Sequence, residues 1–329
     1  MNNISAVRYL LAFSVVIAHV GELMGFTVYW PIPSYIAVGG FFSLSGYLVF
    51  ASYERRPELS NFLRSRARRI MPSYIFIVLL CATFLFIVSS SGPKAYFASS
   101  QWWRYVGANL CFLNFLQPTL PGVFDNHLHT AVNGSLWTMK IEWMLYLSIP
   151  IVAWICRRWN FKRTRIAVAI YLLSVAYRII FVKLFELTGN DMYLMLSRQV
   201  FGQLAFFYTG VWIHSRFDLF NNYRHPIALI SLLLVFAKDY IPYYNYLLEP
   251  AVVTFLVIYA CTTGRWGTWI PRKGNCSYEI YLSHFPIIQL GICCGLTSLG
   301  FWPSLLIVVL VTSLFSYLLS LVAGHWQSK

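Results

Sequence analysis

Charged side chains are scarce in this chain: Asp, Glu, Lys and Arg together make up 11% of its 329 residues. A soluble domain typically carries about a quarter of such residues, whereas here hydrophobic residues reach 58% and aromatic residues 18%. Too little polar surface is available to cover a water-soluble body of this size. The composition excludes a soluble enzyme, a disordered tail and a secreted disulfide scaffold, and it predicts an integral membrane protein.

Acidic residues are the rarer charged class, with 11 Asp and Glu against 25 Lys and Arg, which gives a net charge of +14. In a soluble protein this excess would suggest a nucleic-acid partner. In a membrane protein, basic residues gather in the cytoplasmic loops instead. We therefore predict contacts with membrane lipids and no nucleic-acid partner.

Motifs for metals and nucleophiles are also lacking. The seven cysteines fall mostly in apolar runs and show no paired C-x-x-C spacing, so we interpret them as small apolar fillers. No phosphate-binding glycine loop and no G-x-S-x-G motif is present. His127 and His129 form an H-x-H pair for which no third ligand is evident. We predict no metal site and no permanently bound cofactor.

Long apolar runs, in contrast, recur along the whole chain. A helix that crosses a bilayer needs about 20 mainly apolar residues. Runs of this kind predict an all-α, polytopic membrane protein with about ten transmembrane helices. The expected spans are residues 5–25, 34–53, 70–90, 137–155, 166–186, 194–215, 226–240, 247–263, 276–296 and 303–323.

The distribution of basic residues predicts the orientation. The expected loops 54–69 and 156–165 are rich in Arg and Lys, whereas the loops on the opposite side hold little beyond Lys94 and Arg104. By the positive-inside rule, the N- and C-termini are cytoplasmic. The stretch 91–136 then lies outside.

This outer stretch contains an apolar piece with polar interruptions near 102–118. A full crossing there would break the charge pattern, so we expect a helix that lies on the membrane surface or dips partway into it. No repeat and no separate soluble domain is visible, and residues 1–329 are interpreted as a single membrane domain.

Ionisable residues inside expected spans are candidate functional groups, because burying a charge there costs about 2.5–3.5 kcal/mol on insertion scales. His19 follows Arg8 by eleven positions in the first span, which returns to nearly the same helix face about 16 Å further on. Both side chains should face one groove, with His19 toward the outer side. The alternatives are a packed histidine bonded to a backbone carbonyl and, for Arg8, a snorkelling cytoplasmic arginine.

Glu142 in the fourth span is expected at nearly the same depth as His19. A carboxylate at that depth needs a partner, and an imidazole is a natural one, since the carboxylate would orient it for base or nucleophilic chemistry. Lys140 is two positions away and leaves the helix on another face. Arg178, also expected in the outer half, stays open as the alternative partner.

The ninth expected span carries Ser277, Tyr281 and His284 on one helical stripe, with His284 nearer the cytoplasmic half. Such a stripe lines a cavity or serves interhelical hydrogen bonds. Small residues around Ser45 in the second span indicate close helix packing. The run Arg64–Arg69 suits an anionic ligand, although membrane topology and lipid headgroups explain it as well.

Taken together, these pieces resemble the acyltransferase type 3 family of bacterial membrane proteins. The resemblance lies in five segments in the family's order. They are Arg8 with His19 (R-x10-H), Phe41–Tyr47 (F-F-x-x-S-G-[FY]), Arg66–Pro72 (a basic run and a proline), Ser135–Pro150 (S-L-W-[ST]-x-x-x-E-x-x-x-Y-x-x-x-P) and Ser277–Pro286 (S-Y-x-x-Y-L-x-H-x-P).

The resemblance implies a ten-span enzyme of the bacterial inner membrane that moves an acyl group, usually acetyl, from cytoplasmic acyl-CoA to a sugar hydroxyl outside. The segment Asn133–Thr138 looks most like stand-alone O-acetyltransferases of O-antigen and exopolysaccharide. The acceptor would be a surface polysaccharide, such as lipopolysaccharide O-antigen, or its lipid-linked oligosaccharide precursor. The tail 324–329 lacks the acidic-proline ending of many members, so no role is assigned to that ending.

In the resulting hypothesis His19 is the general base that removes the proton of the sugar hydroxyl, and Glu142 orients the imidazole. A covalent acyl-His19 intermediate is equally open, and the oxyanion is stabilised by Ser45, Tyr281 or a backbone amide. The remaining residues divide into two groups. For acyl-CoA they are Arg8, Arg64, Arg66, Arg68, Arg69 and Ser45; for the acceptor or cavity lining they are Trp137, Tyr146, Arg178, Ser277, Tyr281 and His284.

Two other functions fit the same features. A transporter or flippase of lipid-linked saccharides would also have ten spans, intramembrane charges and small-residue constrictions, but would release no CoA. A non-catalytic membrane partner with this fold would tolerate substitution of His19 and Glu142.

Overall fold

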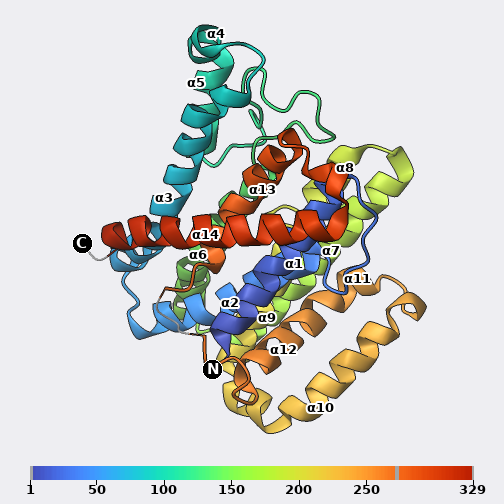
Figure 1. Cartoon of the computed structure of the whole chain (residues 1–329). Coiled ribbons are helices and arrows are strands. Elements are labelled where there is room, and N and C mark those ends of the chain that lie inside the picture. The colour runs from blue at the N-terminus through green and yellow to red at the C-terminus, as the bar shows by residue number, and fades with distance from the viewer. Residues whose placement is uncertain (1–2, 271–273, 328–329) are drawn as a thin grey trace. The chain divides into compact units, whose positions relative to one another are not determined.

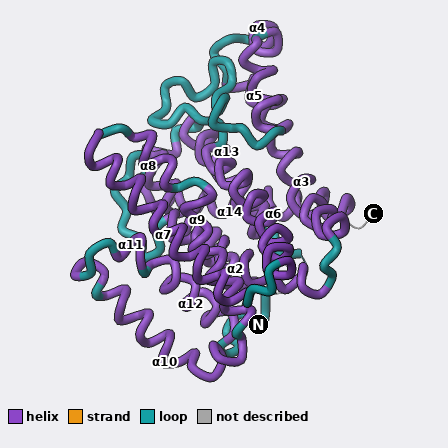
Figure 2. The backbone as a smooth tube through the Cα atoms, turned by 180° about the vertical axis from the view of Figure 1, so that it is seen from behind, coloured by secondary structure: helices purple, strands orange, loops and turns teal. Residues whose placement is uncertain are grey.

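The computed structural model describes residues 3–270 and 274–327, with the side chains of 325–327 left aside. All regular structure in these two ranges is helical, and no strand occurs in them (Figure 2). The all-α class predicted from the apolar runs is thus confirmed. The longest mainly irregular stretch of the described ranges lies between residues 111 and 133.

The helices come in the order of the expected spans, and Figure 1 shows them along the chain by colour. The α-helices are α1 (Ile4–Met24), α2 (Ser34–Arg55), α3 (Leu59–Phe84), α4 (Pro93–Ala98), α5 (Ser100–Leu110), α6 (Trp137–Arg158), α7 (Arg163–Thr188), α8 (Asp191–Ser197), α9 (Val200–Ser215), α10 (Phe217–Phe236), α11 (Tyr244–Leu247), α12 (Glu249–Thr262), α13 (Ser277–Cys293) and α14 (Phe301–Gln327). The short 3-10 turns are η1 (Leu85–Val88), η2 (Gly134–Leu136), η3 (Lys238–Tyr240) and η4 (Leu296–Leu299).

Six helical segments of the described ranges are long and apolar enough to cross a membrane. They contain α1, α2, α3, α6, α7 and α14. Helices also occupy the other four expected positions, but α9, α12 and α13 have only 16, 14 and 17 residues, and α10 carries ionisable residues in its first half. The chain is therefore a multi-pass helical membrane protein, while the count of ten spans and the cytoplasmic termini stay predictions.

Three local expectations differ from the structure. The expected loop 54–69 is helical from Leu59 onward, so the basic run lies inside α3 and Pro72 lies within that helix rather than at its start. Helix α10 begins at Phe217 instead of near 226. Hydropathy marks only the lipid-facing part of a helix, and arginine is a good helix former. In the outer stretch, α5 fills only the first half of the expected range 102–118.

The chain divides into two compact units. The first unit comprises Met1–Val7, Tyr35–Phe62 and Ile141–Ile270, and the second comprises Arg8–Ser34, Leu63–Lys140 and Pro271–Lys329. The interpretation of the whole chain as a single membrane domain stays a prediction.

In the first unit, α7 packs along α9, and α12 packs against α9 and α10 (Figure 1). Glycines let helix α2 approach α9 closely: a Cβ atom at Gly46 would lie 1.9 Å from the Phe207 carbonyl oxygen, and one at Gly210 would lie 2.2 Å from the Ser43 carbonyl oxygen. The Ser43 and Thr254 hydroxyls bond at 2.7 Å and join α2 to α12. The close packing predicted from the small residues of the second span is confirmed, and it follows the rule for helix contacts in membranes.

In the second unit, α13 packs against α14 and against the turn η2. The outer stretch is tied to α3 by buried tyrosines, since Tyr96 donates to the Ala82 carbonyl at 2.9 Å and Tyr74 donates to the Asn109 carbonyl at 2.6 Å. Both rings are fully buried. These bonds give α4 and α5 a fixed place on the end of α3.

Candidate active site

The centre of the candidate site is a pair of histidines in the second unit. His19 of α1 and His284 of α13 are hydrogen-bonded through Nδ1 and Nε2 at 2.8 Å, and their rings stack with centroids 5.1 Å apart. The His284 side chain is completely buried. The bond places both rings at one level, so the two expected depths, His19 toward the outer side and His284 nearer the cytoplasmic half, cannot both hold. Helix α13 is short, so its eighth residue already lies at its middle.

A backbone carbonyl determines which nitrogen of each ring carries the proton. His284 Nδ1 lies 3.0 Å from the Ile280 carbonyl oxygen, which can only accept a hydrogen bond. Neutral His284 must therefore carry its proton on Nδ1 and accept on Nε2. His19 then donates from Nδ1 to His284, which leaves the Nε2 lone pair of neutral His19 to take a proton or attack a carbonyl carbon. The assignment follows from the hydrogen-bond network.

The segment before α6 completes one wall of this site. The Ser135 hydroxyl lies 3.3 Å from His284 Nε2. Asn133 fixes the segment at both ends: its Nδ2 donates to the Leu282 carbonyl at 2.7 Å, and its Oδ1 accepts from the Ser135 amide at 3.2 Å. A Cβ atom at Gly134 would lie 2.8 Å from the Phe285 ring, so glycine permits this contact. The segment around Ser135 and the segment Ser277–Pro286, which are far apart in the sequence, are thus in contact around His284.

Tyr281, one turn before His284, also belongs to this wall. Its hydroxyl lies 2.9 Å from the Thr138 hydroxyl and 3.2 Å from the Ser135 carbonyl oxygen, to which it donates. Ser277 instead bonds locally, because its hydroxyl donates to Asn275 Oδ1 at 2.6 Å. The members of the predicted stripe therefore differ in role: His284 belongs to the histidine pair, Tyr281 lies beside it, and Ser277 bonds to Asn275 before the start of α13.

A glutamine that the sequence did not single out anchors the outer loop to α13. Buried Gln289 donates to the carbonyls of His129 and Ala131 at 2.6 and 2.9 Å and bonds His127 Nδ1 through its Oε1 at 2.8 Å. Its position one turn and a half beyond His284 on the same helix was the available signal. Among the described residues no group of three or more His, Cys, Asp or Glu is placed to hold a metal ion.

The basic run lies near the start of α3 in the second unit. Arg64, Arg68 and Arg69 are exposed and Arg66 is half-buried. Buried Glu279 of α13 accepts from the Ser73 hydroxyl at 2.8 Å and interacts electrostatically with Arg69. The run thus presents several guanidinium groups to solvent from a helix that is bonded to α13.

The remaining predicted site residues are divided between the units. Arg8 and Trp137 are half-buried in the second unit, and Ser45 is half-buried in the first. Glu142 also belongs to the first unit, where it accepts a hydrogen bond from Tyr146 one turn along α6. Because His19 belongs to the second unit, its predicted pairing with Glu142 stays a prediction.

The alternative partners considered for Glu142 have other interactions. The Lys140 ammonium lies 4.1 Å from the centroid of the Phe115 ring. The Arg178 guanidinium lies over the rings of Tyr246 and Phe206 at 5.2 and 5.9 Å and interacts electrostatically with Glu249. Arg178 therefore belongs to a separate polar cluster in the first unit.

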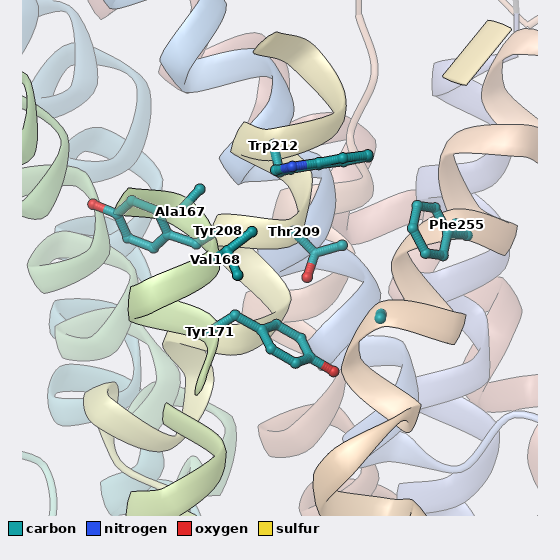
Figure 3. Close-up of a pocket in the computed structure, with 8 residues that line it drawn as sticks. Ala167, Val168, Tyr171, Tyr208, Thr209, Trp212 and Phe255 are labelled. Carbon is teal, nitrogen blue, oxygen red and sulfur yellow. The ribbon is translucent and has the colours of Figure 1, made fainter. Parts of the chain in front are cut away.

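A cavity of about 160 Å³ opens in the first unit between α7, α9 and α12 (Figure 3). Its hydroxyl groups are used elsewhere: Tyr171 donates to the Leu247 carbonyl at 2.5 Å, Tyr208 to Ser148 at 3.0 Å, and Thr209 to the Ala205 carbonyl at 2.7 Å. With Trp212 and Phe255 completing its walls, the cavity is apolar and holds neither a base nor an acid. Such a surface suits contact with lipid chains rather than catalysis.

Comparison with known families gives one match, to the family described as an acyltransferase domain, over residues 1–321. That range contains every residue of the candidate site. It also includes both units of the structure almost completely.

Several curated proteins are similar over most of the chain. The O-acetyl transferase of Shigella phage Sf6 is 25% identical over 289 residues, which are 86% of this chain and 81% of the phage protein. The O-acetyltransferase OatA of Staphylococcus aureus is 22% identical and the putative peptidoglycan O-acetyltransferase YrhL of Bacillus subtilis is 23% identical, each over 79% of this chain. The matches cover only 47% of OatA and 45% of YrhL, so the chain spans about half the length of these two relatives. No solved structure matches the chain.

Proposed function

The chain belongs to the acyltransferase family whose model covers its residues 1–321, and we propose that this enzyme transfers an acetyl group from acetyl-CoA to a sugar hydroxyl of a polysaccharide. The names of three relatives support O-acetylation, and one of these names is that of a putative peptidoglycan O-acetyltransferase. A surface polysaccharide such as O-antigen, or its lipid-linked precursor, is the acceptor in this proposal. The enzyme would work in the bacterial inner membrane with acetyl-CoA entering from the cytoplasm.

The observation that carries the proposal is the His19–His284–Ile280 chain of hydrogen bonds. It leaves His19 Nε2 with a lone pair in the neutral imidazole. In direct transfer, Nε2 takes the proton of the sugar hydroxyl while its oxygen attacks the thioester carbonyl carbon. The C–S bond then breaks, and the leaving CoA thiolate receives a proton from the imidazolium. General-base assistance of this kind typically contributes about 10²–10⁴-fold in rate.

The same lone pair also allows a two-step route. His19 Nε2 would attack the thioester carbon, the C–S bond would break, and CoA would leave as the thiolate. The sugar hydroxyl would then attack the carbonyl carbon of the acyl-imidazolium and break its N–C bond, and the hydroxyl proton would pass to the freed Nε2 and from there to the thiolate. In either route Nδ1 is committed to His284. Glu142 would therefore have to act on the Nε2 side of His19, or on the acceptor hydroxyl itself.

Donor binding is assigned to the basic run. Guanidinium groups remain charged and match phosphate oxygens with two parallel hydrogen bonds. Arg64, Arg68 and Arg69 are exposed, so they can meet the phosphates of CoA. Arg8 and Ser45 are proposed further along the path of the acyl-pantetheine arm, and Trp137 and Tyr146 beside the acceptor.

The test uses purified protein in lipid nanodiscs with acetyl-CoA and oligosaccharide that has been de-O-acetylated with mild alkali. Free CoA should appear in proportion to acetylated sugar, and His19→Ala should reduce this by about 10²–10⁴-fold. The control is His225→Ala, because His225 is an exposed histidine of α10 that bonds Tyr259. Normal transfer by the His19 variant would remove this residue from the mechanism. Movement of lipid-linked sugar without CoA release would indicate a flippase instead.

A further inference from the structure

A second group of ionisable residues lies partly buried in the first unit and takes no part in bond making in the proposed reaction. It consists of Arg178 of α7, Glu249 at the first residue of α12 and Tyr35 near the start of α2. Glu249 is only 5% exposed, and its Oε1 accepts from the Tyr35 hydroxyl at 3.3 Å. We call these three residues the outer cluster, because the predicted topology places all three toward the outer side.

Each charged member of the outer cluster keeps one atom without a partner. Nη1 of Arg178 and Oε2 of Glu249 are both buried and have no hydrogen bond. The two charges interact electrostatically, yet within the described part of the chain no ion pair of 4.0 Å or less joins them. A purely structural pair would close directly in the two-pronged geometry that arginine favours with a carboxylate.

The unpaired atoms have complementary chemistry. Arg178 offers an N–H donor, and Glu249 offers a carboxyl oxygen that can accept a hydrogen bond. A sugar hydroxyl satisfies both, because it can donate its proton to the carboxylate and accept from the guanidinium through its oxygen. Two adjacent hydroxyls of one ring would satisfy both atoms at once.

The surroundings hold the guanidinium in place and leave the cluster reachable. Arg178 lies over the Tyr246 and Phe206 rings. A Cβ atom at Gly202 would lie 1.9 Å from the Ser197 carbonyl oxygen and 3.3 Å from the Arg178 Cγ, so glycine permits the close backbone contact beside the arginine stem. Tyr35, in contrast, is 54% exposed. A ligand can therefore approach along the tyrosine side, and aromatic faces are available beside the polar atoms.

We propose that the outer cluster binds hydroxyl groups of the saccharide acceptor. Glu249 Oε2 accepts from one sugar hydroxyl, Arg178 Nη1 donates to an adjacent oxygen, and the Tyr35 hydroxyl keeps the carboxylate oriented. This inference rests on the proposed function, because it assigns the acceptor of the same enzyme. Glu249 and Arg178 bind substrate, Tyr35 positions Glu249, and none of the three takes part in bond making.

The test compares Glu249→Gln and Arg178→Met with a matched pair of controls, Glu186→Gln and Lys183→Met. The controls remove the same charges from an exposed ion pair on α7, with a Lys183 to Glu186 distance of 2.6 Å. Binding of de-O-acetylated oligosaccharide to nanodisc protein without acetyl-CoA is measured by calorimetry, together with KM for each substrate and thermal unfolding. The outer-cluster variants should raise the Kd and KM for the saccharide at least tenfold and leave KM for acetyl-CoA unchanged, and the controls should change neither.

The opposite result is equally defined. If Glu249→Gln and Arg178→Met lower the unfolding temperature but leave the saccharide Kd unchanged, the outer cluster is structural and the proposal is wrong. Tyr35→Phe covers the case in which those variants fail to fold, since it removes one oxygen from an exposed side chain; it should raise the saccharide Kd severalfold, and an unchanged Kd would overturn the proposal. Failure of the proposed function would differ, because the wild-type protein would then release no CoA with any saccharide.

Discussion

At the scale of single residues, His284 controls the chemistry available to His19. Its Nδ1 proton is held by the Ile280 carbonyl, and its Nε2 accepts from His19. The residue thus acts through another side chain and is a positioning residue. Nδ1 acts as a donor and Nε2 as an acceptor. The amide group of asparagine can take the position of Nδ1, and that of glutamine can take the position of Nε2.

His284→Gln and His284→Asn should therefore behave differently. The longer glutamine places an acceptor near the position of Nε2 and can keep the bond from His19, whereas asparagine reaches only the position of Nδ1. We expect Gln to retain kcat within about tenfold and Asn to lose about 10²–10⁴-fold, the range of general-base assistance. Both should keep KM for acetyl-CoA. Equal losses in kcat for the two variants would show that only the packing of the imidazole matters.

The residue level also shows where sequence reasoning stops. His19 was identified because an ionisable group inside an apolar helix is costly to bury and is therefore a candidate functional group. Its bond to His284 was not foreseen, because periodicity gives the face of each helix but not its rotation and depth against another helix. Asn133 and Gln289 act through long-range bonds to backbone carbonyls, and a single sequence holds no signal for such partners.

At the scale of elements, the start of α3 carries the proposed donor site. Replacing Arg68 and Arg69 together by alanine should raise KM for acetyl-CoA by about tenfold or more, since each lost charge-assisted hydrogen bond is worth about 1.5–3 kcal/mol. The matched control is Arg55→Ala with Arg56→Ala, which removes two charges of the same predicted loop from the end of α2. The measurement is CoA release as a function of acetyl-CoA concentration. Equal effects of both pairs would mean that the run only sets topology.

The contact between α2 and α9 should be sensitive to a single methyl group. Gly46→Ala places a Cβ atom 1.9 Å from the Phe207 carbonyl oxygen, and main chain cannot move aside as a side chain can. Overpacking typically costs about 1–3 kcal/mol, which should lower the unfolding temperature in detergent. Gly107→Ala in α5 meets nothing within 4 Å and should be neutral or slightly stabilising. A neutral Gly46 variant would show that the two helices are not in tight contact.

Apart from α3, α9 and α10, the helices were predictable to within about four residues, because apolar runs follow the helix period and the bilayer sets their length. Helix ends were less so. The basic start of α3 and the polar start of α10 were assigned to loops, because hydropathy reports the lipid-facing part of a helix and not its hydrogen bonds. The turn η2 was invisible as structure, although its residues were recognised as a motif.

At the scale of the whole molecule, composition and charge predict a multi-pass protein with both termini in the cytoplasm. A green fluorescent protein fused after Lys329 should fluoresce, and alkaline phosphatase fused there should be inactive. Phosphatase inserted in the outer stretch near Gly92 should be active, because that stretch is predicted to be external. Active phosphatase at Lys329 would show that the predicted orientation is reversed or that the number of spans is odd.

The group that orders the histidine pair is a main-chain oxygen, and this limits how the site can vary. No substitution at position 280 deletes a carbonyl, so any side chain that fits the buried space of Ile280 and maintains the helix preserves the location of the proton. A mutation can move this carbonyl only by changing the helical backbone, for instance by introducing a proline that displaces the turn. The reactivity of His19 is in this sense a property of helix geometry, protected from most point mutations beside it.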